Sequence, residues 1–290
     1  MYRLGVVGVG VMGSDIALNC AAYGFEVLAV DFQEHALESL VMHLPRKLRG
    51  YRMLGAELKE SSAKEILARI KTSTDLTDLA DVHFVIESIT ENKDIKRELY
   101  RKLNDICRKD TVFAVNTSCT SITELAAEIK HPQCMIGAHF MNPVPMKSVV
   151  EVVKGFHTSK ETIEKLSQLI GTLGKKAIVV EDSPGFVVNR LSHLFMNEAA
   201  FLVQEGIAKP QEIDELFRLG YGHKMGPLAT ADLIGLDTVM DSLNVLYESM
   251  QDDKFRCCPL LKKMVNAGLL GTKSGKGFYE YGDWNTSHFC

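Results

Sequence analysis

The chain has 290 residues, of which 46% are hydrophobic and 24% are charged, and its formal net charge is −4. This length allows a large hydrophobic core and favours two domains, and the composition is that of an ordinary globular protein. The slightly acidic balance provides no long-range attraction to nucleic acid or to an anionic membrane. No apolar stretch approaches the roughly twenty residues that span a bilayer. We therefore expect neither nucleic acid nor membrane as a partner.

The cysteine pattern points to a reducing compartment. The seven cysteines are Cys20, Cys107, Cys119, Cys134, Cys257, Cys258 and Cys290. An odd number without CxxC spacing argues against a disulfide framework and against a zinc site, so no metal is expected. A cytoplasmic location fits best. The first predicted strand begins so close to Met1 that we expect no signal or transit peptide.

The first thirty-one residues contain the strongest pattern in the chain. An apolar run over residues 3–7 predicts a buried strand, and a helical pattern is followed by a second strand, residues 26–30, that ends at Asp31. Between the first strand and the helix lie Gly8, Val9, Gly10, Val11, Met12 and Gly13. This order of strand, glycine turn, helix, strand and acid is typical of a Rossmann-type dinucleotide-binding unit.

Each part of this pattern has a physical role in holding a dinucleotide. Gly8 permits the tight turn, Gly10 lets the backbone approach a pyrophosphate, and Gly13 lets helix and strand pack closely. The helix N-terminus offers N–H groups to the phosphates. Asp31 would bond the ribose hydroxyls and repel a 2′-phosphate, so we expect NAD as cofactor. A glycine-rich turn in another α/β protein is the alternative. The expected NAD contacts here are Gly8, Gly10, Val11, Met12, Gly13 and Asp31.

The rest of the chain divides into an alternating half and a helical half. A doubly wound parallel sheet is predicted, with further strands at 82–86, 111–115, 135–138, 149–153 and 177–180. Helices are predicted between these strands at 95–106, 122–129 and 163–173, together with a helical hairpin at about 34–70. After Asp182-Ser183-Pro184, a helix start signal, helices are predicted at 185–205, 210–219, 227–250 and 259–267. We therefore expect a Rossmann-type domain, 1–182, followed by an all-helical domain, 183–290, whose stretch from Gly271 onward forms a surface tail.

A histidine and a glutamate are candidates for proton transfer. Oxidising an alcohol with NAD needs a base for the hydroxyl proton. His139 ends a predicted strand, at the edge where open α/β sheets bind ligands. Glu151 lies among valines, where an unpaired carboxylate is costly to bury. Pairing would offset that cost and fix the imidazole tautomer. The alternatives are a surface or core histidine and a glutamate that faces water from an edge strand.

Two further polar groups are candidates with open alternatives. Asn116-Thr117-Ser118 follows the strand that ends at Val115 and could reach a substrate oxygen or the nicotinamide. These residues could equally form the turn and N-cap before the next helix. Asn189 lies nearly opposite the apolar face of its predicted helix, so it faces either water or the other domain. Only the second placement would make it catalytic.

At these residues the chain closely resembles the L-3-hydroxyacyl-CoA dehydrogenases, especially the short bacterial 3-hydroxybutyryl-CoA dehydrogenases. The resemblance runs from residue 5 to residue 281 through GVGVMGSDIA, VIESITENKDIKREL, VNTSCTSIT, GAHFMNPVP, VVEVVKG, SPGFVVNRL, GHKMGPLATADLIGLD and LLGTKSGKGFYEY. It implies reversible NAD-dependent oxidation of an L-3-hydroxyacyl-CoA within fatty acid metabolism, such as β-oxidation or butanoate metabolism. It also implies a homodimer that forms through the C-terminal helical domain.

The resemblance assigns roles to individual residues. It implies that His139 is the general base for the 3-hydroxyl and that Glu151 is its partner. Asn189 and Ser118 would bond the 3-oxygen and the thioester region of the substrate. Glu91 and Lys96 match positions that line the cofactor and the active site, and Asn142 would close the pocket near His139. Asn116, from the polar run after Val115, is a further expected cofactor contact. The chain departs from the family pattern at Cys119, Met141 and Lys224, which leaves the acyl-chain preference open.

Coenzyme A carries phosphates, so a basic surface should meet its nucleotide. Arg46, Lys47, Arg49 and Arg52 cluster on the first stretch of the predicted hairpin. This cluster, or nearby Lys59, is expected to contact CoA, and a solvated basic face is the alternative.

Two other functions fit the same pattern. One is a NAD-dependent dehydrogenase of a free 3-hydroxy acid or sugar acid, which would not require CoA. The other is a non-enzymatic NAD-binding protein that keeps the fold. The joint presence of His139, Glu151, Ser118 and Asn189 favours an enzyme over the latter.

Overall fold

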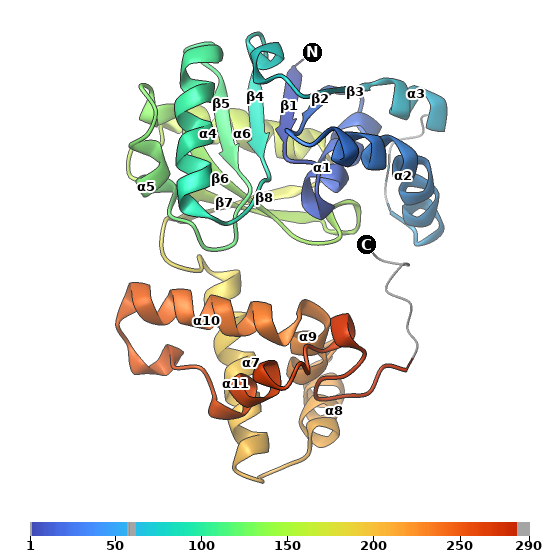
Figure 1. The fold of residues 1–290 in the computed structure, drawn as a ribbon, viewed down its shortest axis with the longest axis vertical. Helices are drawn as coiled ribbons and strands as arrows, with labels where there is room; N and C mark the ends of the chain where they lie inside the picture. Colours follow the sequence, from blue (N-terminus) through green and yellow to red (C-terminus); the bar gives the residue numbers. More distant parts are fainter. Residues whose placement is uncertain (1, 57, 59–61, 283–290) are drawn as a thin grey trace. The chain divides into compact units, whose positions relative to one another are not determined.

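The structure is a computed structural model that describes residues 2–56, 58 and 62–282. The chain divides into two compact units, Met1–Ser183 and Pro184–Cys290. The first is a sheet covered by helices and the second is helical (Figure 1). The predicted α/β fold, a Rossmann-type doubly wound sheet followed by an all-helical C-terminal part, is therefore confirmed.

One sheet organises the described part of the first unit. Its strands lie in the order β3-β2-β1-β4-β5-β6-β7-β8. Their bounds are β1 Arg3–Val7, β2 Glu26–Val30, β3 Ile70–Ser73, β4 Phe84–Glu87, β5 Val112–Val115, β6 Met135–Phe140, β7 Val149–Lys154 and β8 Lys176–Glu181. Neighbouring strands are parallel except β6 and β7, which are antiparallel. The strand order reverses between β1 and β4, which is the point where open α/β sheets bind ligands.

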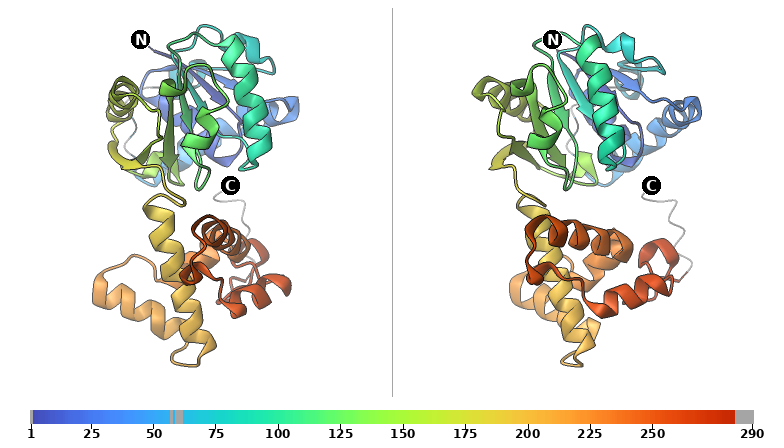
Figure 2. Two further views of the ribbon diagram at one scale, coloured as in Figure 1. Left: turned by 90° about the vertical axis from the view of Figure 1, so that its left-hand side faces the viewer. Right: turned by 60° about the vertical axis from the view of Figure 1, so that its left-hand side comes forward.

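Helices cover both faces of this sheet (Figure 2). They are α1 Val11–Ala22, α2 Glu34–Met53, α3 Ala63–Ala68, α4 Lys93–Ile106, α5 Ile122–Ala126 and α6 Lys160–Thr172. Alternate strand residues such as Ile86 and Ala138 pack in one core cluster with side chains of α1, α2 and α6. Side chains alternate between the faces of a strand, so the neighbouring residues Glu87 and His139 face the layer of α4 and α5.

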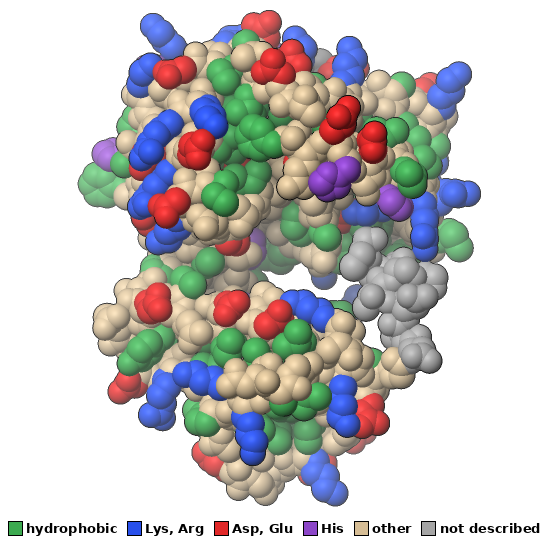
Figure 3. All heavy atoms as spheres, in the orientation of Figure 1, with side chains coloured by type: hydrophobic (Ala, Val, Ile, Leu, Met, Phe, Trp, Pro, Cys, Tyr) green, Lys and Arg blue, Asp and Glu red, His purple; other side chains and the backbone are tan. Residues whose placement is uncertain are grey.

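The outer surface of α4 and α5 is a charged, solvated face. Lys93 pairs with Glu124 at 3.0 Å, and Arg101 pairs with Glu128 at 2.8 Å. Lys, Arg, Asp and Glu side chains are interspersed on this side of the first unit (Figure 3). Exposed pairs of this kind contribute little to stability, on the order of 0–1 kcal/mol each.

Two predicted elements differ in the structure. The predicted hairpin over 34–70 consists of α2 and α3, and edge strand β3 follows from Ile70 and was not predicted. The sequence of β3, Ile-Lys-Thr-Ser, is only partly buried, so its apolar pattern is weak. The predicted helix over 227–250 is divided by Gly235, whose φ of +103° is incompatible with a continuous helix.

The second unit packs its helices around a core of its own. They are α7 Val188–Gln204, α8 Pro210–Tyr221, α9 Pro227–Ile234, α10 Leu236–Met250 and α11 Pro259–Asn266. Buried side chains from all five helices form this core, among them Met196, Ile213, Leu228, Leu243 and Leu261. None of the helices in the described residues is long and apolar enough to cross a membrane.

Two buried aspartates hold the helical unit together. Asp214 accepts the main-chain N–H groups of Leu228 and Ala229, both at 2.8 Å, and so caps the start of α9. Asp232 accepts the N–H groups of Phe278 and Tyr279, both at 3.0 Å. The stretch from Gly271 onward was expected to be a surface tail. As far as the structure describes it, this stretch is partly or fully exposed after Gly271, as expected, and it is also anchored on the buried carboxylate of Asp232.

Candidate active site

The turn after β1 contains three glycines, of which two are closely packed and one borders open space. Gly8 has a φ of +88°, and a Cβ atom there would lie 2.7 Å from the carbonyl oxygen of Ser88. A Cβ atom at Gly13 would lie 1.8 Å from the carbonyl oxygen of Gly8. At Gly10 a Cβ atom would meet nothing within 4 Å. Gly8 and Gly13 are therefore required by the packing of the turn, whereas Gly10 borders open space.

The start of α1 suits the diphosphate of a dinucleotide, and Asp31 suits its ribose. The first turn of α1 contains no acidic residue, and Gly10 supplies no side-chain cap, so its N–H groups suit a diphosphate. Asp31 follows β2, and its carboxylate accepts the N–H groups of Val9 and Gln33, both at 3.0 Å. These bonds hold the carboxylate beside the glycine turn. The residues present therefore fit NAD.

The predicted histidine–glutamate pair is formed in the sheet. His139 on β6 lies directly opposite Glu151 on β7 in the antiparallel register. The two atoms Nδ1 of His139 and Oε2 of Glu151 are 2.9 Å apart. His139 is 7% exposed and Glu151 is 3% exposed. Glu151 is thus a buried carboxylate with an imidazole partner, and the surface and edge-strand alternatives do not apply to this geometry.

Asn116 joins the ends of three strands. Its N–H donates to the carbonyl oxygen of Glu87 at 2.8 Å, and its Nδ2 donates to Oγ of Ser88 at 2.8 Å. Its Oδ1 accepts the N–H of Phe140 at 3.2 Å. Asn116 therefore links the carboxyl ends of β4, β5 and β6. Its contact with the cofactor stays a prediction.

Glu91 holds the loop that contains Ser118. Its carboxylate accepts the N–H of Ser118 at 2.8 Å and the hydroxyls of Thr117 and Thr120 at 2.6 Å and 3.1 Å. The N-cap of α5 is Ser121, which accepts the N–H of Glu124. Residues 117–120 are therefore a turn organised by a carboxylate. Burial and the nearby charge of Glu91 raise the pKa of the Cys119 thiol in this turn to about 11, so it is a poor nucleophile near neutral pH.

Lys96 forms an ion pair with Glu87, which is not among the predicted site residues. Its Nζ lies 2.7 Å and 2.8 Å from the two oxygens of Glu87, and the hydroxyl of Tyr100 donates to the same carboxylate at 3.2 Å. All three side chains are fully buried, and burial raises the pKa of Glu87 while Lys96 opposes this rise. Glu87 could have been identified from the sequence as an acid that directly follows the apolar run of the predicted strand 82–86. A direct contact between Lys96 and NAD stays a prediction.

Lys47 contacts the first helix of the Rossmann-type unit. Its Nζ donates to Oδ1 of Asp15 at 2.9 Å and to Oγ of Ser14 at 2.7 Å, and Tyr51 donates to Oδ2 of Asp15 at 2.6 Å. The other members of the predicted basic cluster, Arg46, Arg49 and Arg52, are exposed on α2. Lys59 lies outside the described residues.

The remaining predicted residues lie in a loop and in the second unit. Asn142 is exposed in the loop between β6 and β7. Asn189 lies in the first turn of α7 in the second unit, and its carbonyl oxygen is 2.8 Å from Nδ1 of His193. The roles of both side chains stay predictions.

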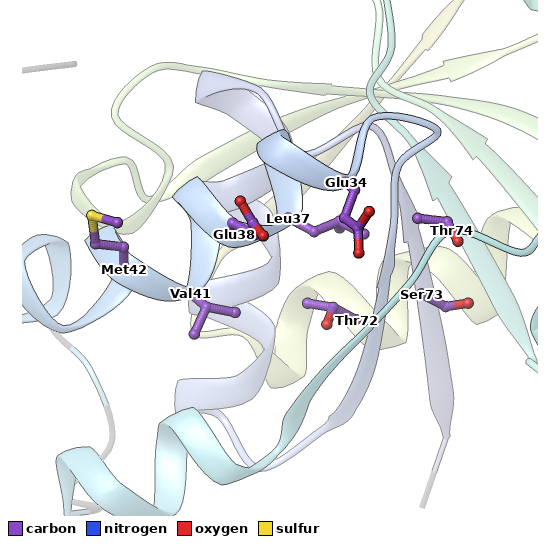
Figure 4. Close-up of a pocket in the computed structure, with 8 residues that line it drawn as sticks. All are labelled: Glu34, Leu37, Glu38, Val41, Met42, Thr72, Ser73 and Thr74. Atoms are coloured by element: carbon purple, nitrogen blue, oxygen red, sulfur yellow. The ribbon is translucent and has the colours of Figure 1, made fainter.

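A hollow on the surface of the first unit lies beside Asp31, whose N–H donates to the carbonyl oxygen of the lining residue Ser73 at 3.3 Å. It has a volume of about 650 Å³ and is bordered by α2 and by β3 with the residues that follow it (Figure 4). Its lining includes Glu34, Glu38, Val41 and Thr72. None of the predicted site residues lines it. No group of three or more potential metal ligands is found in the described part of the chain.

The contrast between Gly10 and Gly13 gives a test of the nucleotide site. Gly10→Ala should leave the melting temperature unchanged and weaken NADH binding, because the new methyl group enters only the space beside the turn. Gly13→Ala should lower the melting temperature as well, because its methyl group collides with the main chain of Gly8. Thermal melting and NADH fluorescence titration measure both effects. Undiminished NADH affinity in Gly10→Ala would place the pyrophosphate elsewhere.

Comparison with known proteins covers nearly the whole chain. The 3-hydroxyacyl-CoA dehydrogenase NAD-binding domain model matches residues 3–183, and the C-terminal domain model of the same family matches residues 185–281. A probable 3-hydroxybutyryl-CoA dehydrogenase of Bacillus subtilis is 45% identical, over 95% of this chain and 96% of the relative. The 3-hydroxybutyryl-CoA dehydrogenase of Clostridioides difficile is 42% identical, over 96% and 99%.

A solved structure agrees with these sequence matches. The (S)-3-hydroxybutyryl-CoA dehydrogenase of Ralstonia eutropha superposes with a TM-score of 0.92 at 42% identity, covering 98% of this chain and 100% of that one. The matches include both the NAD-binding part, with its glycine turn and Asp31, and the helical part. The chain therefore belongs to the 3-hydroxyacyl-CoA dehydrogenase family, whose members are NAD-dependent oxidoreductases.

Proposed function

We propose that the protein is a NAD-dependent L-3-hydroxyacyl-CoA dehydrogenase that interconverts a short 3-hydroxyacyl-CoA, such as 3-hydroxybutyryl-CoA, and the corresponding 3-oxoacyl-CoA. The observation that carries the proposal is the hydrogen bond between His139 and Glu151 at the edge of a sheet whose first strands hold the NAD site. Relatives at 40–45% identity are named for this activity.

The His139–Glu151 geometry suits a general base for an alcohol. When Nδ1–H of the neutral imidazole donates to Glu151, the lone pair resides on Nε2 and can accept the 3-hydroxyl proton. NAD held at the glycine turn and Asp31 would supply the hydride acceptor for C3, so that a C=O bond would form as the C–H and O–H bonds break. The carboxylate of Glu151 stabilises the imidazolium while it carries the proton. In the reverse direction the same nitrogen returns the proton to the oxygen.

The remaining site residues complete this proposal. Ser118 and Asn189 would bond the 3-oxygen and the thioester region, and Asn142 would close the pocket near His139. Glu91 supports Ser118 by accepting its main-chain N–H at 2.8 Å. Ser118 and Asn116 would also contact the cofactor.

The activity is tested by acetoacetyl-CoA reduction with NADH, extended across longer acyl chains and compared with free acetoacetate. We expect reduction of the CoA ester and negligible reduction of the free acid. His139→Gln should lower turnover by about 10²–10⁴-fold, the usual contribution of a general acid or base, while NADH binding survives. Equal activity on the free acid would favour the alternative dehydrogenase. Turnover near wild type in His139→Gln would remove the histidine from the mechanism.

Replacement of Glu151 tests the coupling of the pair. In Glu151→Gln the imidazolium that forms when His139 accepts the hydroxyl proton loses the carboxylate that stabilises it. The acid limb of the rate profile for 3-hydroxybutyryl-CoA oxidation should therefore move to lower pH, with reduced maximal turnover. Glu181→Gln, at an exposed glutamate on β8, is the matched control. An acid limb that coincides with the control would show that the two groups act independently.

We also infer that the exposed arginines of α2 contact the nucleotide of CoA. Arg46, Arg49 and Arg52 are exposed on this helix, while Lys47 is held by Asp15. Arg49→Glu should raise the KM for acetoacetyl-CoA more than the KM for the pantetheine thioester, which lacks the nucleotide. Arg108→Glu, at an exposed arginine elsewhere on the first unit, is the control. Equal changes for both substrates would assign the cluster to a solvated face.

The helical unit is proposed to form a homodimer. Leu216 and Leu219 on α8 are 68% and 76% exposed, and Tyr221 at its end is 77% exposed. Several large apolar side chains exposed along one helix are typical of an interaction surface. Leu219→Glu should convert a dimer into a monomer in analytical ultracentrifugation, and Leu54→Glu, at the exposed leucine directly after α2, is the control. A wild-type monomer, or a dimer that survives Leu219→Glu, would contradict this assignment.

We infer a cytoplasmic location and a place in fatty acid or butanoate metabolism. The support comes from the cysteine thiols and from the chemistry of the proposed substrate. All six cysteines in the described residues are free thiols, which suits a reducing compartment. The proposed substrate is a short acyl thioester of the kind that β-oxidation consumes.

A further inference from the structure

Lys175 is a buried lysine that the proposed mechanism does not use. It lies between α6 and β8, directly after Gly174, whose φ is +70°. The residue is only 8% exposed. Lysine is rarely buried, because its ammonium group loses hydration that the protein must replace. Burial lowers the pKa of Lys175, so the contacts that the ammonium group makes decide whether it stays charged.

The ammonium group of Lys175 binds both ends of one short turn. Its Nζ donates to the carbonyl oxygen of Val144 at 2.7 Å and to that of Lys147 at 2.6 Å. Val144 is the first residue of the 3₁₀ turn Val144–Met146, and Lys147 directly follows the turn. The turn itself is closed by weaker main-chain bonds, from Met146 to Pro143 at 3.0 Å and from Lys147 to Val144 at 3.3 Å. A charged donor forms stronger hydrogen bonds than a neutral one, so Lys175 adds a polar restraint to the packing of Val144 in the hydrophobic core.

This turn belongs to the loop that connects the two strands of the histidine–glutamate pair. Residues 141–148 lead from β6, which carries His139 near its end, to β7, which carries Glu151 near its start. Asn142 lies in the same loop. The neighbouring Lys176 donates its main-chain N–H to the carbonyl oxygen of Ser148 at 2.7 Å. The side chain of residue 175 and the main chain of residue 176 therefore fix the loop at three successive points.

We propose that Lys175 is a positioning residue for His139, Glu151 and Asn142. Its ammonium group holds the loop from the residue before β8, the strand that pairs with β7, and so helps to fix where the end of β6 and the start of β7 lie. The inference rests on the proposed function of the pair. Without this donor the carbonyl oxygens of Val144 and Lys147 lose their charged partner, and Val144 keeps only the 3.3 Å bond from the N–H of Lys147, so the loop is less firmly held. A displacement of about 1 Å at reacting groups can cost about 10²-fold in rate.

Lys175→Met tests the proposal, because methionine occupies similar space without a donor. We expect its kcat for acetoacetyl-CoA reduction to fall by at least about tenfold, as for misplaced reacting groups, with a smaller change in the KM for NADH. The acid limb of the oxidation profile should move in the direction predicted for Glu151→Gln. Lys175→Arg, which retains a charged donor, should recover part of kcat. Lys176→Met, at the adjacent exposed lysine, should resemble wild type.

A second readout does not depend on turnover. Imidazole ¹⁵N chemical shifts, assigned with His139→Gln, report the tautomer and protonation of His139 directly. In Lys175→Met these signals should shift and titrate differently from wild type, and in Lys176→Met they should not. If the wild-type protein failed to reduce acetoacetyl-CoA, the proposed function would fall, and the NMR comparison would still decide whether Lys175 positions His139.

The proposal is overturned if folded Lys175→Met matches Lys176→Met in kcat, in the pH profile and in the His139 signals. Circular dichroism and thermal melting establish folding. If Lys175→Met does not fold, Lys175→Leu, which also has no donor, undergoes the same comparison. Coincidence of Lys175→Leu with Lys176→Met in all three readouts would likewise overturn the proposal.

Discussion

The need to pair buried charge shapes the functional part of this protein. Glu87 faces Lys96, Glu151 faces His139, and Asp15 faces Lys47, and in each case the acid is almost fully buried. Removing one partner of such a pair typically costs roughly 3–5 kcal/mol, because a bare charge remains in a medium of low polarity. Each pair therefore stabilises the position of both of its side chains.

The single antiparallel pairing in the described sheet places one of these pairs. In a parallel arrangement, β6 and β7 would need a long crossover between them, and the start of β7 would lie at the opposite edge from the end of β6. The short loop over 141–148 instead brings the end of one strand beside the start of the next. His139 and Glu151 thereby become direct cross-strand neighbours at the edge where the nucleotide strands also end.

Much of this could be predicted from the sequence, for identifiable reasons. The glycine turn and Asp31 were predicted because their spacing reflects a main-chain requirement, and Glu151 because a charge among valines requires a partner. Strand β3 was missed because an edge strand with two exposed residues has little apolar pattern. Glu87 and Lys175 were missed because their partners come from other elements. Sequence periodicity shows that a residue is buried but not which group it contacts.

The anchoring of Phe278 and Tyr279 on Asp232 has a consequence for how the chain folds during synthesis. The Rossmann-type unit has all its strands once residue 181 has emerged from the ribosome. The helical unit, in contrast, keeps a buried aspartate without its N–H donors until residues 278 and 279 have been added. Its final stability is therefore acquired only late in translation, and ribosome-bound chains that stop short of these residues should expose an incompletely closed helical unit to chaperones and proteases.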